Sequence, residues 1–310
     1  MGALLDRRLV YVTGKGGVGK TTVAAALGLA AARAGKRTMV CEVAEQERIT
    51  QAFGKPPTGF RETEVAPNLH AFSIDPQAAK EEWLRFRLHS GRLAGLLSQS
   101  RVYQYLTAAA PGLAELVTIG KIWELAQLQR KTAKASPYDL VVVDAPATGH
   151  GIALLRAPRT FADIARVGPL HSQTSTIHSS VTDPSFTAVV AVAVAEEIPV
   201  NETIDLERRL REQVGMDLAA VLVNGVLPER FSAAEARRIE SVDGTGGEAA
   251  REALAAALAA RERARGQRSQ ISRLRRSVEA PVATLPFLLT PELGQDDLEA
   301  LSRELARKVT

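Results

Sequence analysis

The feature that most constrains the fold is a glycine-rich octapeptide near the start of the chain, GKGGVGKT at residues 14–21. It fits the pattern G-x-x-x-x-G-K-T, follows the apolar run RLVYVTG (8–14) and opens an Ala-rich helical pattern at Thr21–Ala34. Glycines let a backbone wrap around a phosphate without Cβ clashes, and the free N–H groups at a helix start attract anions. The motif therefore predicts a phosphate-binding loop between a strand and a helix.

Two side chains of this loop have predicted roles of their own. Lys20 is expected to reach the outer phosphates of a nucleotide such as ATP, and Thr21 to offer its hydroxyl to Mg²⁺. The remaining positions are expected to bind phosphate mainly through their backbone. The predicted nucleotide-binding residues of the loop are Gly14, Lys15, Gly16, Gly17, Val18, Gly19, Lys20, Thr21 and Thr22.

Six further apolar runs predict a sheet around this loop. Most are continuously apolar, which is typical of parallel strands covered on both faces. Helical patterns at Asn201–Gln213 and Asp296–Lys308 alternate with them, as in right-handed crossovers. We therefore expect a doubly wound, mainly parallel α/β sheet in a single P-loop NTPase domain spanning residues 1–310. The six runs are residues 37–43, 69–75, 138–146, 186–195, 218–225 and 280–286.

Two connections are too long for simple crossovers. Residues 76–137 contain apolar helical patterns, and residues 151–185 hold a short helical pattern followed by a Ser/Thr-rich loop, HSQTSTIHSS (171–180). Together they predict a helical lobe inserted at one edge of the sheet. His171 and His178 are seven positions apart, which fits no common metal site, so we expect a flexible surface loop there.

Composition excludes several classes of protein. No stretch is long and apolar enough to span a bilayer, and the chain start lacks a secretory signal pattern, so we expect a cytoplasmic protein. The single cysteine, Cys41, excludes an intramolecular disulfide framework. The net charge is +4, with much of the excess in 251–276 of the Ala/Arg/Glu-rich helical region 229–276. Such a helix can bind nucleic acid or anionic lipid, but we favour a solvated face because no aromatic residues interleave with the arginines.

A second signature, VVVDAPATGHGIALLRAP (141–158), follows another predicted strand. Asp144 ends the apolar run, where a carboxylate can hold Mg²⁺ through a water molecule. A helix cap is the alternative role for such a residue, and the phosphate loop favours the metal role. Gly149 can donate its N–H to a γ-phosphate, so this segment is a candidate nucleotide-sensing switch.

A phosphate loop needs one lysine, and this one has a second, Lys15. The sequence KGGVGKTT resembles the deviant phosphate loop of the ParA/MinD/ArsA group of dimeric ATPases. That resemblance implies that Lys15 crosses a dimer interface to the partner's phosphates and neutralises charge in the transition state. A solvent-facing lysine is the alternative, and we favour the crossing role.

The segment 141–158 resembles the D-T-A-P-T-G-H-T-x-R-L-L-x-x-P signature of the ArsA family. This family includes the bacterial arsenite-pump ATPase and the guided-entry ATPase that delivers tail-anchored proteins to membranes. The resemblance implies that Asn224 reads adenine and that Pro286 and Phe287 pack on the purine. The segments with weaker similarity are APGLAEL (110–116), EEIPVNETIDLERRL (196–210), VLVNGV (221–226) and LPFLLTPELG (285–294).

One family motif is altered. Members usually carry T-D-P-A-H after the second strand, with an Asp that orients the attacking water, and alignment of 37–54 places Ala44 at that position. Alanine has no acceptor with which to orient water. Three interpretations stay open: Glu45 or Glu42 substitutes, hydrolysis is slow, or this subunit pairs with a paralogue that keeps its Asp. The predicted catalytic residues are Lys15, Lys20, Asp144 and Glu45.

Two further family traits concern ligands and clients. With Cys41 alone, neither the zinc clip nor the arsenite-binding cysteine trio of family members can form, which disfavours arsenite export. Apolar residues of the predicted lobe either line a client groove or form a helix–helix core, and we favour the core. These residues are Trp83, Leu84, Phe86, Leu88, Leu96, Leu97, Val102, Tyr103 and Leu106.

The resemblance thus implies a dimeric, Mg²⁺-dependent ATPase that couples nucleotide state to a protein client or a membrane-associated partner. The mate is either a second copy or an ArsA-like paralogue. The alternative is a catalytically weak nucleotide-binding subunit that partners an active paralogue. A ParA-type DNA-partition ATPase is a third hypothesis, against which the DAPATGH segment argues.

Overall fold

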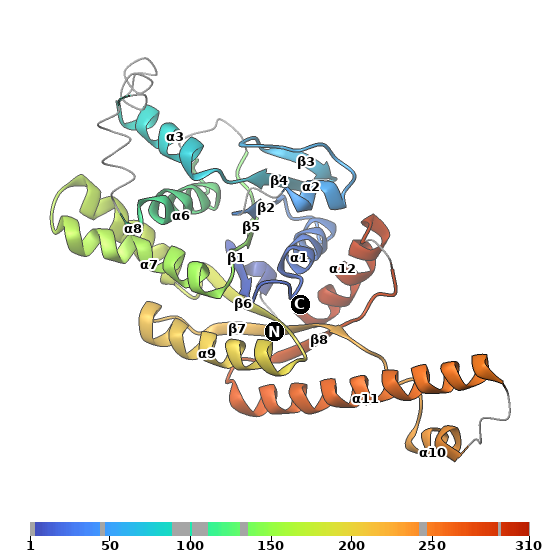
Figure 1. Ribbon diagram of the computed structural model, residues 1–310. Helices are drawn as coiled ribbons and strands as arrows, with labels where there is room; N and C mark the ends of the chain where they lie inside the picture. The colour runs from blue at the N-terminus through green and yellow to red at the C-terminus, as the bar shows by residue number, and fades with distance from the viewer. Residues whose placement is uncertain are drawn as a thin grey trace.

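An eight-stranded sheet in the order β3-β4-β2-β5-β1-β6-β7-β8 organises the chain (Figure 1). The structure is a computed structural model, and it describes residues 4–43, 47–88, 100, 111–130, 136–241, 247–290 and 293–309. The strands are β1 Leu9–Gly14, β2 Thr38–Glu42, β3 Thr63–Ala66, β4 Leu69–Ser73, β5 Leu140–Asp144, β6 Thr187–Val194, β7 Leu218–Val226 and β8 Val282–Pro286.

Helices lie on both faces of this sheet. Leu4–Asp6 forms a short 3₁₀ turn before β1. The described α-helices are α1 Lys20–Arg33, α2 Arg48–Ala52, α3 Pro76–Leu88, α6 Leu113–Leu125, α7 Thr148–Ala165, α8 Pro169–Thr182, α9 Glu197–Val214, α10 Ala233–Ser241, α11 Glu248–Ser277 and α12 Gln295–Val309.

The predicted doubly wound, mainly parallel sheet is confirmed. Each of the seven predicted apolar runs contains or overlaps a strand, and every pairing except β3 with β4 is parallel. All residues of β1, β2 and β5 are buried, which explains why these strands lack the alternation of a half-exposed sheet.

Strand β3 was not predicted. It has only four residues, and Glu64 on it is exposed, so the apolar signal is weak. It pairs antiparallel with β4 through the tight connection at Pro67 and Asn68. Asn68 adopts a left-handed φ of 61°, a conformation that asparagine tolerates better than most residues. The Pro-Asn pair was the available signal for this hairpin.

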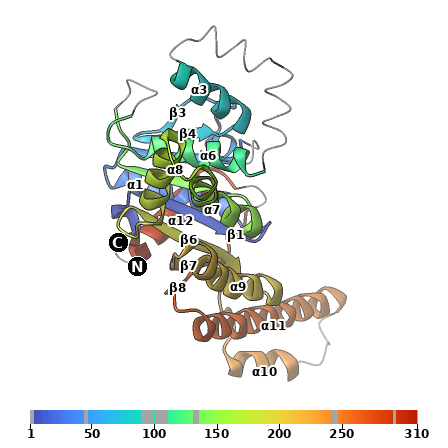
Figure 2. The same ribbon diagram turned by 90° about the vertical axis from the view of Figure 1, so that its left-hand side faces the viewer.

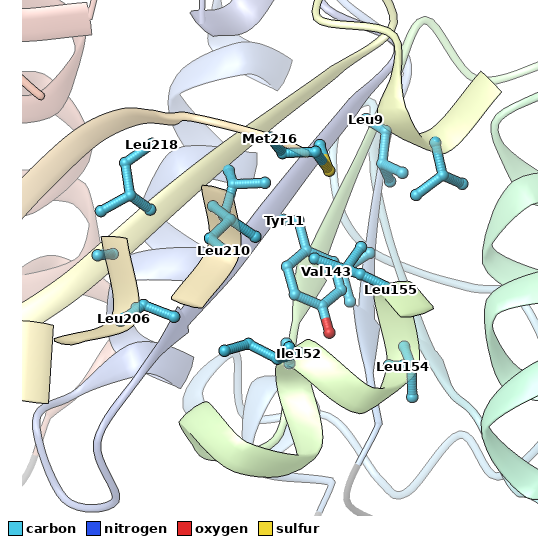
Figure 3. Close-up of a cluster of buried hydrophobic side chains, with 14 of the residues drawn as sticks. Leu9, Tyr11, Val143, Ile152, Leu154, Leu155, Leu206, Leu210, Met216 and Leu218 are labelled. Atoms are coloured by element: carbon cyan, nitrogen blue, oxygen red, sulfur yellow. The ribbon is translucent and has the colours of Figure 1, made fainter. Parts of the chain in front are cut away.

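Each face of the sheet has its own apolar core. One core joins the sheet to α1 and α12 and includes Leu27 and Leu301. The other joins it to α6, α7, α8 and α9. Figure 3 shows part of this second core, with Tyr11 of β1, Ile152 of α7, and Leu206 and Leu210 of α9. The phosphate loop connects β1 to α1, which packs on the first face of the sheet. Helix α9 packs on the opposite face.

Helices α3, α6, α7 and α8 pack together over one face of the sheet, where α6 contacts β5, α7 contacts β1 and α8 contacts β6 (Figures 1 and 2). They come from the two long connections that predicted a helical lobe. The division into one domain with a lobe at 76–137 and 151–185 stays a prediction, because part of it lies outside the described residues. Of the apolar residues listed for the lobe, those from Leu96 to Leu106 also lie outside them.

The predicted Ser/Thr-rich loop at 171–180 is wrong, because these residues lie in helix α8. Its hydroxyl groups donate to carbonyls one turn back, as Thr174 does to Leu170 and Thr176 to Ser172, so the helix itself satisfies them. Thr174, Ile177 and Val181 are buried at helical spacing. The high hydroxyl content concealed this periodicity.

Helix α9 begins at Glu197, four residues before the predicted start. Pro199 lies in its first turn, where a proline is tolerated because its missing N–H is not needed there. Helices α10 and α11 fit the predicted Ala/Arg/Glu-rich helical region, and they extend outward beyond β8 (Figures 1 and 2). Within the described ranges, every helix is too short or too polar to cross a bilayer.

A buried ionic cluster ties α6 and its following turn to the start of the β3 hairpin. The guanidinium of Arg130 is 1% exposed and contacts the carboxylates of Glu62 at 2.5 Å and Glu124 at 3.3 Å. Tyr138 also donates to Glu62 at 2.7 Å. Burial alone would raise the pKa of Glu62, but the hydrogen bonds from Arg130 and Tyr138 outweigh it, and the net pKa is lowered.

Replacing Glu62 by Gln is expected to destabilise the fold by about 3 kcal/mol at pH 7, because it removes one carboxylate from a buried guanidinium. Since the pKa of Glu62 is lowered by folding, its stabilisation is present above the unfolded pKa of about 4.3 and is lost as the pH falls below it. Urea unfolding at pH 7 and at low pH measures both effects. Glu64→Gln, at an exposed position of β3, is the control. Equal losses for the two variants would contradict a role for the cluster.

Candidate functional site

The glycine-rich loop turns from β1 into α1 through backbone conformations that favour glycine. Gly14 has a φ of 143°, and a Cβ there would lie 2.2 Å from the carbonyl oxygen of Val192 on β6. Gly17 and Gly19 have φ of 84° and 89°, in the left-handed region. Gly19 is the residue before the first turn of α1. The sequence pattern and the observed turn therefore agree.

The loop residues form a backbone cradle at the start of α1. Gly16 and Gly17 are exposed, Val18 is buried beneath them, and Lys20, Thr21 and Thr22 are half-buried. The ammonium of Lys20 donates to the backbone carbonyl of Lys15 at 3.0 Å. Burial lowers the pKa of Lys20, and the charge of Asp144 opposes this shift. The cation thus sits inside the loop, beside the N–H groups that begin the helix.

Asp144 ends β5 directly beside this cradle. The Thr21 hydroxyl donates to its Oδ2 at 2.6 Å, while its buried Oδ1 has no partner within the described residues. Burial raises the pKa of Asp144, and the hydrogen bond from Thr21 and the charge of Lys20 offset only part of this rise. A carboxylate with a free oxygen next to a hydroxyl is a donor set that suits Mg²⁺. The arrangement fits the metal role predicted for Thr21 and Asp144.

Glu42 ends β2 in register with Asp144 on β5. Its two carboxylate oxygens accept from the backbone N–H groups of Arg48 at 2.9 Å and Ile49 at 3.1 Å, so Glu42 caps the start of α2. Burial raises the pKa of Glu42 to about 6, although these amide hydrogen bonds lower it. Both oxygens are thus engaged in holding α2. Ala44 and the candidate Glu45 lie outside the described residues.

The start of α7 is fixed against β1. A Cβ on Gly151 would lie 2.8 Å from Oγ1 of Thr13, and the hydroxyl of Tyr11 donates to the Gly151 carbonyl at 2.9 Å. Tyr11 is fully buried, and its hydroxyl points toward α7 in Figure 3. Gly149, the predicted sensor, lies in the same first turn with open space around it. Sequence reasoning missed Tyr11 and Gly151, which position this segment.

The predicted adenine-reading residues lie on the neighbouring strands. Asn224 of β7 donates to the Val18 carbonyl at 3.1 Å, so its side chain touches the glycine-rich loop. Phe287 follows β8, donates its backbone N–H to the Val226 carbonyl at 2.9 Å and is 47% exposed. Pro286 is also exposed. The structure thus brings Asn224 to the loop and leaves Pro286 and Phe287 beside the end of β7.

Lys15 is held within its own subunit. Its ammonium lies 2.8 Å from Oε1 of Glu202 on α9, with the two side chains 34% and 42% exposed. The predicted crossing to a partner's phosphates is not tested by a single chain and stays a prediction.

Comparison with known families agrees with this geometry. The family model of the anion-transporting ATPases matches residues 7–167 and 163–243, which together are more than half of the chain. The protein belongs to the anion-transporting ATPase family. The ArsA-family resemblance drawn from the loop and from residues 141–158 is therefore confirmed.

Individual relatives support the same membership. The chain is 34% identical to "ATPase BagA" of Mycobacterium tuberculosis over 226 residues, which are 71% of this chain and 66% of that protein. It is 28% identical to "ATPase GET3" of Candida glabrata over 260 residues, covering 72% of this chain and 73% of that protein. A "putative arsenical pump-driving ATPase" of Halobacterium salinarum is 28% identical over 238 residues, 73% of this chain and 36% of that protein. The match thus spans just under two thirds of the mycobacterial relative.

The close contact between α7 and β1 predicts different effects for two glycines of one helical turn. Gly151→Ala is expected to cost about 1–3 kcal/mol of unfolding free energy, because its Cβ meets Thr13 on a buried strand. Gly149→Ala, whose Cβ meets no described atom within 4 Å, is expected to be neutral or to stabilise the helix by up to about 1 kcal/mol. Urea unfolding of both variants measures the difference. Equal stabilities would show that α7 is not packed as closely as described.

Proposed function

We propose that this member of the anion-transporting ATPase family binds and hydrolyses ATP with Mg²⁺, and that it does so as a dimer. The observation that carries the proposal is the Thr21–Asp144 hydrogen bond at the start of α1, beside a buried carboxylate oxygen that has no partner among the described residues. This is the donor set that a magnesium nucleotide needs next to a phosphate-binding backbone.

Each residue of the site has a proposed role. The backbone of residues 14–22 binds the phosphates, and Lys20 moves from the Lys15 carbonyl onto the β- and γ-phosphates. Thr21 and Asp144 hold the metal, which when bound neutralises charge on the phosphates. Asn224 hydrogen-bonds adenine, Pro286 and Phe287 pack on its ring, and the Gly149 N–H donates to the γ-phosphate.

The proposal of a dimer is based on Lys15, the second lysine of the phosphate loop. The resemblance of KGGVGKTT to dimeric ATPases implies that Lys15 completes the pocket of a neighbouring subunit, either a second copy or a paralogue. The proposal needs the Lys15 ammonium to reach a neighbour's triphosphate while Glu202 stays beside it, and a half-exposed, weak ion pair leaves the ammonium free to make this second contact.

Helix α7 offers a physical link from the nucleotide to a client. Its first turn carries Gly149, and its remaining turns pack against α6 and α8. A shift at its start therefore moves the helices around a cavity of about 550 Å³, which includes Trp83, Leu113, Phe161 and Leu170 in its lining. We propose that this cavity takes an apolar segment of a protein client or a membrane-associated partner, in the cytoplasm.

The second candidate function is a catalytically weak, nucleotide-binding subunit. Ala44 in place of the expected Asp favours it, because alanine has no acceptor for the attacking water. Each oxygen of Glu42 already accepts a backbone N–H at the start of α2, so Glu42 would have to orient water while it caps this helix. DNA partition has less support. On α11, Arg268 pairs with Glu229 and Arg273 with Asn201, and no aromatic residues interleave with the arginines.

Phosphate release from ATP tests the proposal. The unmodified protein is expected to hydrolyse ATP, and Lys20→Ala to lose about 100-fold or more of that rate, because the phosphates lose their fixed cation. Chelation of Mg²⁺ is expected to have a similar effect. Turnover that survives in Lys20→Ala would contradict the proposed site.

Ala44→Asp separates the two candidate functions. If the unmodified protein is a weak subunit, restoring the acceptor is expected to raise the rate about 10-fold or more. If Glu45 or Glu42 already orients the water, Ala44→Asp is expected to leave the rate within about 2-fold, and Glu45→Gln or Glu42→Gln to lower it.

A further inference from the structure

The ion pair between Lys15 and Glu202 joins the glycine-rich loop to a helix of the opposite layer. The loop leads into α1, which packs on one face of the sheet, whereas Glu202 lies on α9, which packs on the other. The Lys15 ammonium is therefore drawn across the sheet edge, away from the start of α1. The Lys20 ammonium stays within the loop, on the Lys15 carbonyl.

Helix α9 is a firm support for this pair. Val200, Leu206 and Leu210 are buried against the sheet. Further along α9 than Glu202, the buried carboxylate of Glu207 accepts from the backbone N–H groups of Glu279 and Ala280, which precede β8. Because α9 is anchored from two sides, Glu202 occupies a fixed place relative to the loop.

We propose that Glu202 is a positioning residue for Lys15, which keeps this cation out of its own subunit's phosphate pocket and presents it to the neighbouring subunit. This inference rests on the proposed dimeric ATP-binding function. Lys15 belongs to the same short loop as Lys20, so a bound triphosphate attracts both ammonium groups. If Lys15 binds the nucleotide of its own subunit, its ammonium cannot reach the partner's pocket. The Glu202 carboxylate competes with that nucleotide for the ammonium.

The competition predicts two opposite effects in Glu202→Gln. Lys15 falls onto its own nucleotide, so a single subunit binds nucleotide more tightly. The same cation is then less available across the interface, so the nucleotide-bound dimer is weaker. A half-exposed ion pair changes an equilibrium by up to about 5-fold, and we expect effects of about 3- to 5-fold in each direction.

The test is a double-mutant cycle with two readouts. A fluorescent non-hydrolysable ATP analogue with Mg²⁺, at low protein concentration, reports binding to single subunits, and sedimentation velocity in its presence reports dimerisation. The variants are Lys15→Ala, Glu202→Gln and their combination. Glu212→Gln is the matched control, because Glu212 is an exposed acid on the same helix that pairs with Arg208. Glu202→Asp, which keeps the charge, is expected to restore part of both properties.

The expected result is tighter binding and weaker dimerisation in Glu202→Gln, both absent when Lys15 is already Ala. Three results would overturn the proposal. The first is unchanged nucleotide binding in Glu202→Gln, and the second is an equal change in binding when Lys15 is already Ala. The third, a stronger dimer in Glu202→Gln, would show instead that Glu202 holds Lys15 back from the partner. Failure of the proposed function looks different. In that case the unmodified protein does not bind the analogue, or it binds it and Lys15→Ala has no effect on a dimer that forms normally.

Discussion

Parallel pairing of β2, β5 and β1 sets Glu42, Asp144 and Val12 side by side at one edge of the sheet. Parallel strands all deliver their carboxyl ends to the same edge, so three loops must share that edge. The glycine-rich turn supplies phosphate-binding N–H groups there, β5 supplies a carboxylate, and β2 supplies the cap of α2. The chemistry proposed for the chain depends on this register, because a shift of one residue would turn Asp144 to the other face.

The same edge connects the glycine-rich loop to helices α7 and α9. Tyr11 and Thr13 of β1 hold the first turn of α7, and β6 lies against Gly14. Helix α9 follows β6 and carries Glu202 back to the loop. Elements far apart in sequence therefore meet around residues 14–21. Small residues at Gly14 and Gly151 permit these contacts, since a Cβ at either position would collide with its neighbour.

The sequence was informative where one physical requirement determines the residue type. Continuous apolar runs predicted the parallel strands, and left-handed turns required glycine at positions 17 and 19. Prediction failed where tertiary contacts decide. The hydroxyl-rich composition of α8 is typical of a loop, but Thr174, Ile177 and Val181 are buried along one side of a helix. Strand β3 is a strand only because β4 lies beside it. Glu202 stood in a recognised segment, but its contact with Lys15 spans 187 positions and leaves no local pattern.

The measurement that tests the central claim most directly is a mixture of two inactive variants. Lys15→Ala subunits keep their own Lys20, and Lys20→Ala subunits keep the Lys15 that would complete a neighbour's pocket. If Lys15 acts across the interface, half of the dimers in an equal mixture contain one complete site, so ATP hydrolysis is predicted to recover to about one quarter of the unmodified rate. If the mixture is no more active than the average of its two components, Lys15 completes no pocket between two copies of this chain, and the account of a homodimer is contradicted.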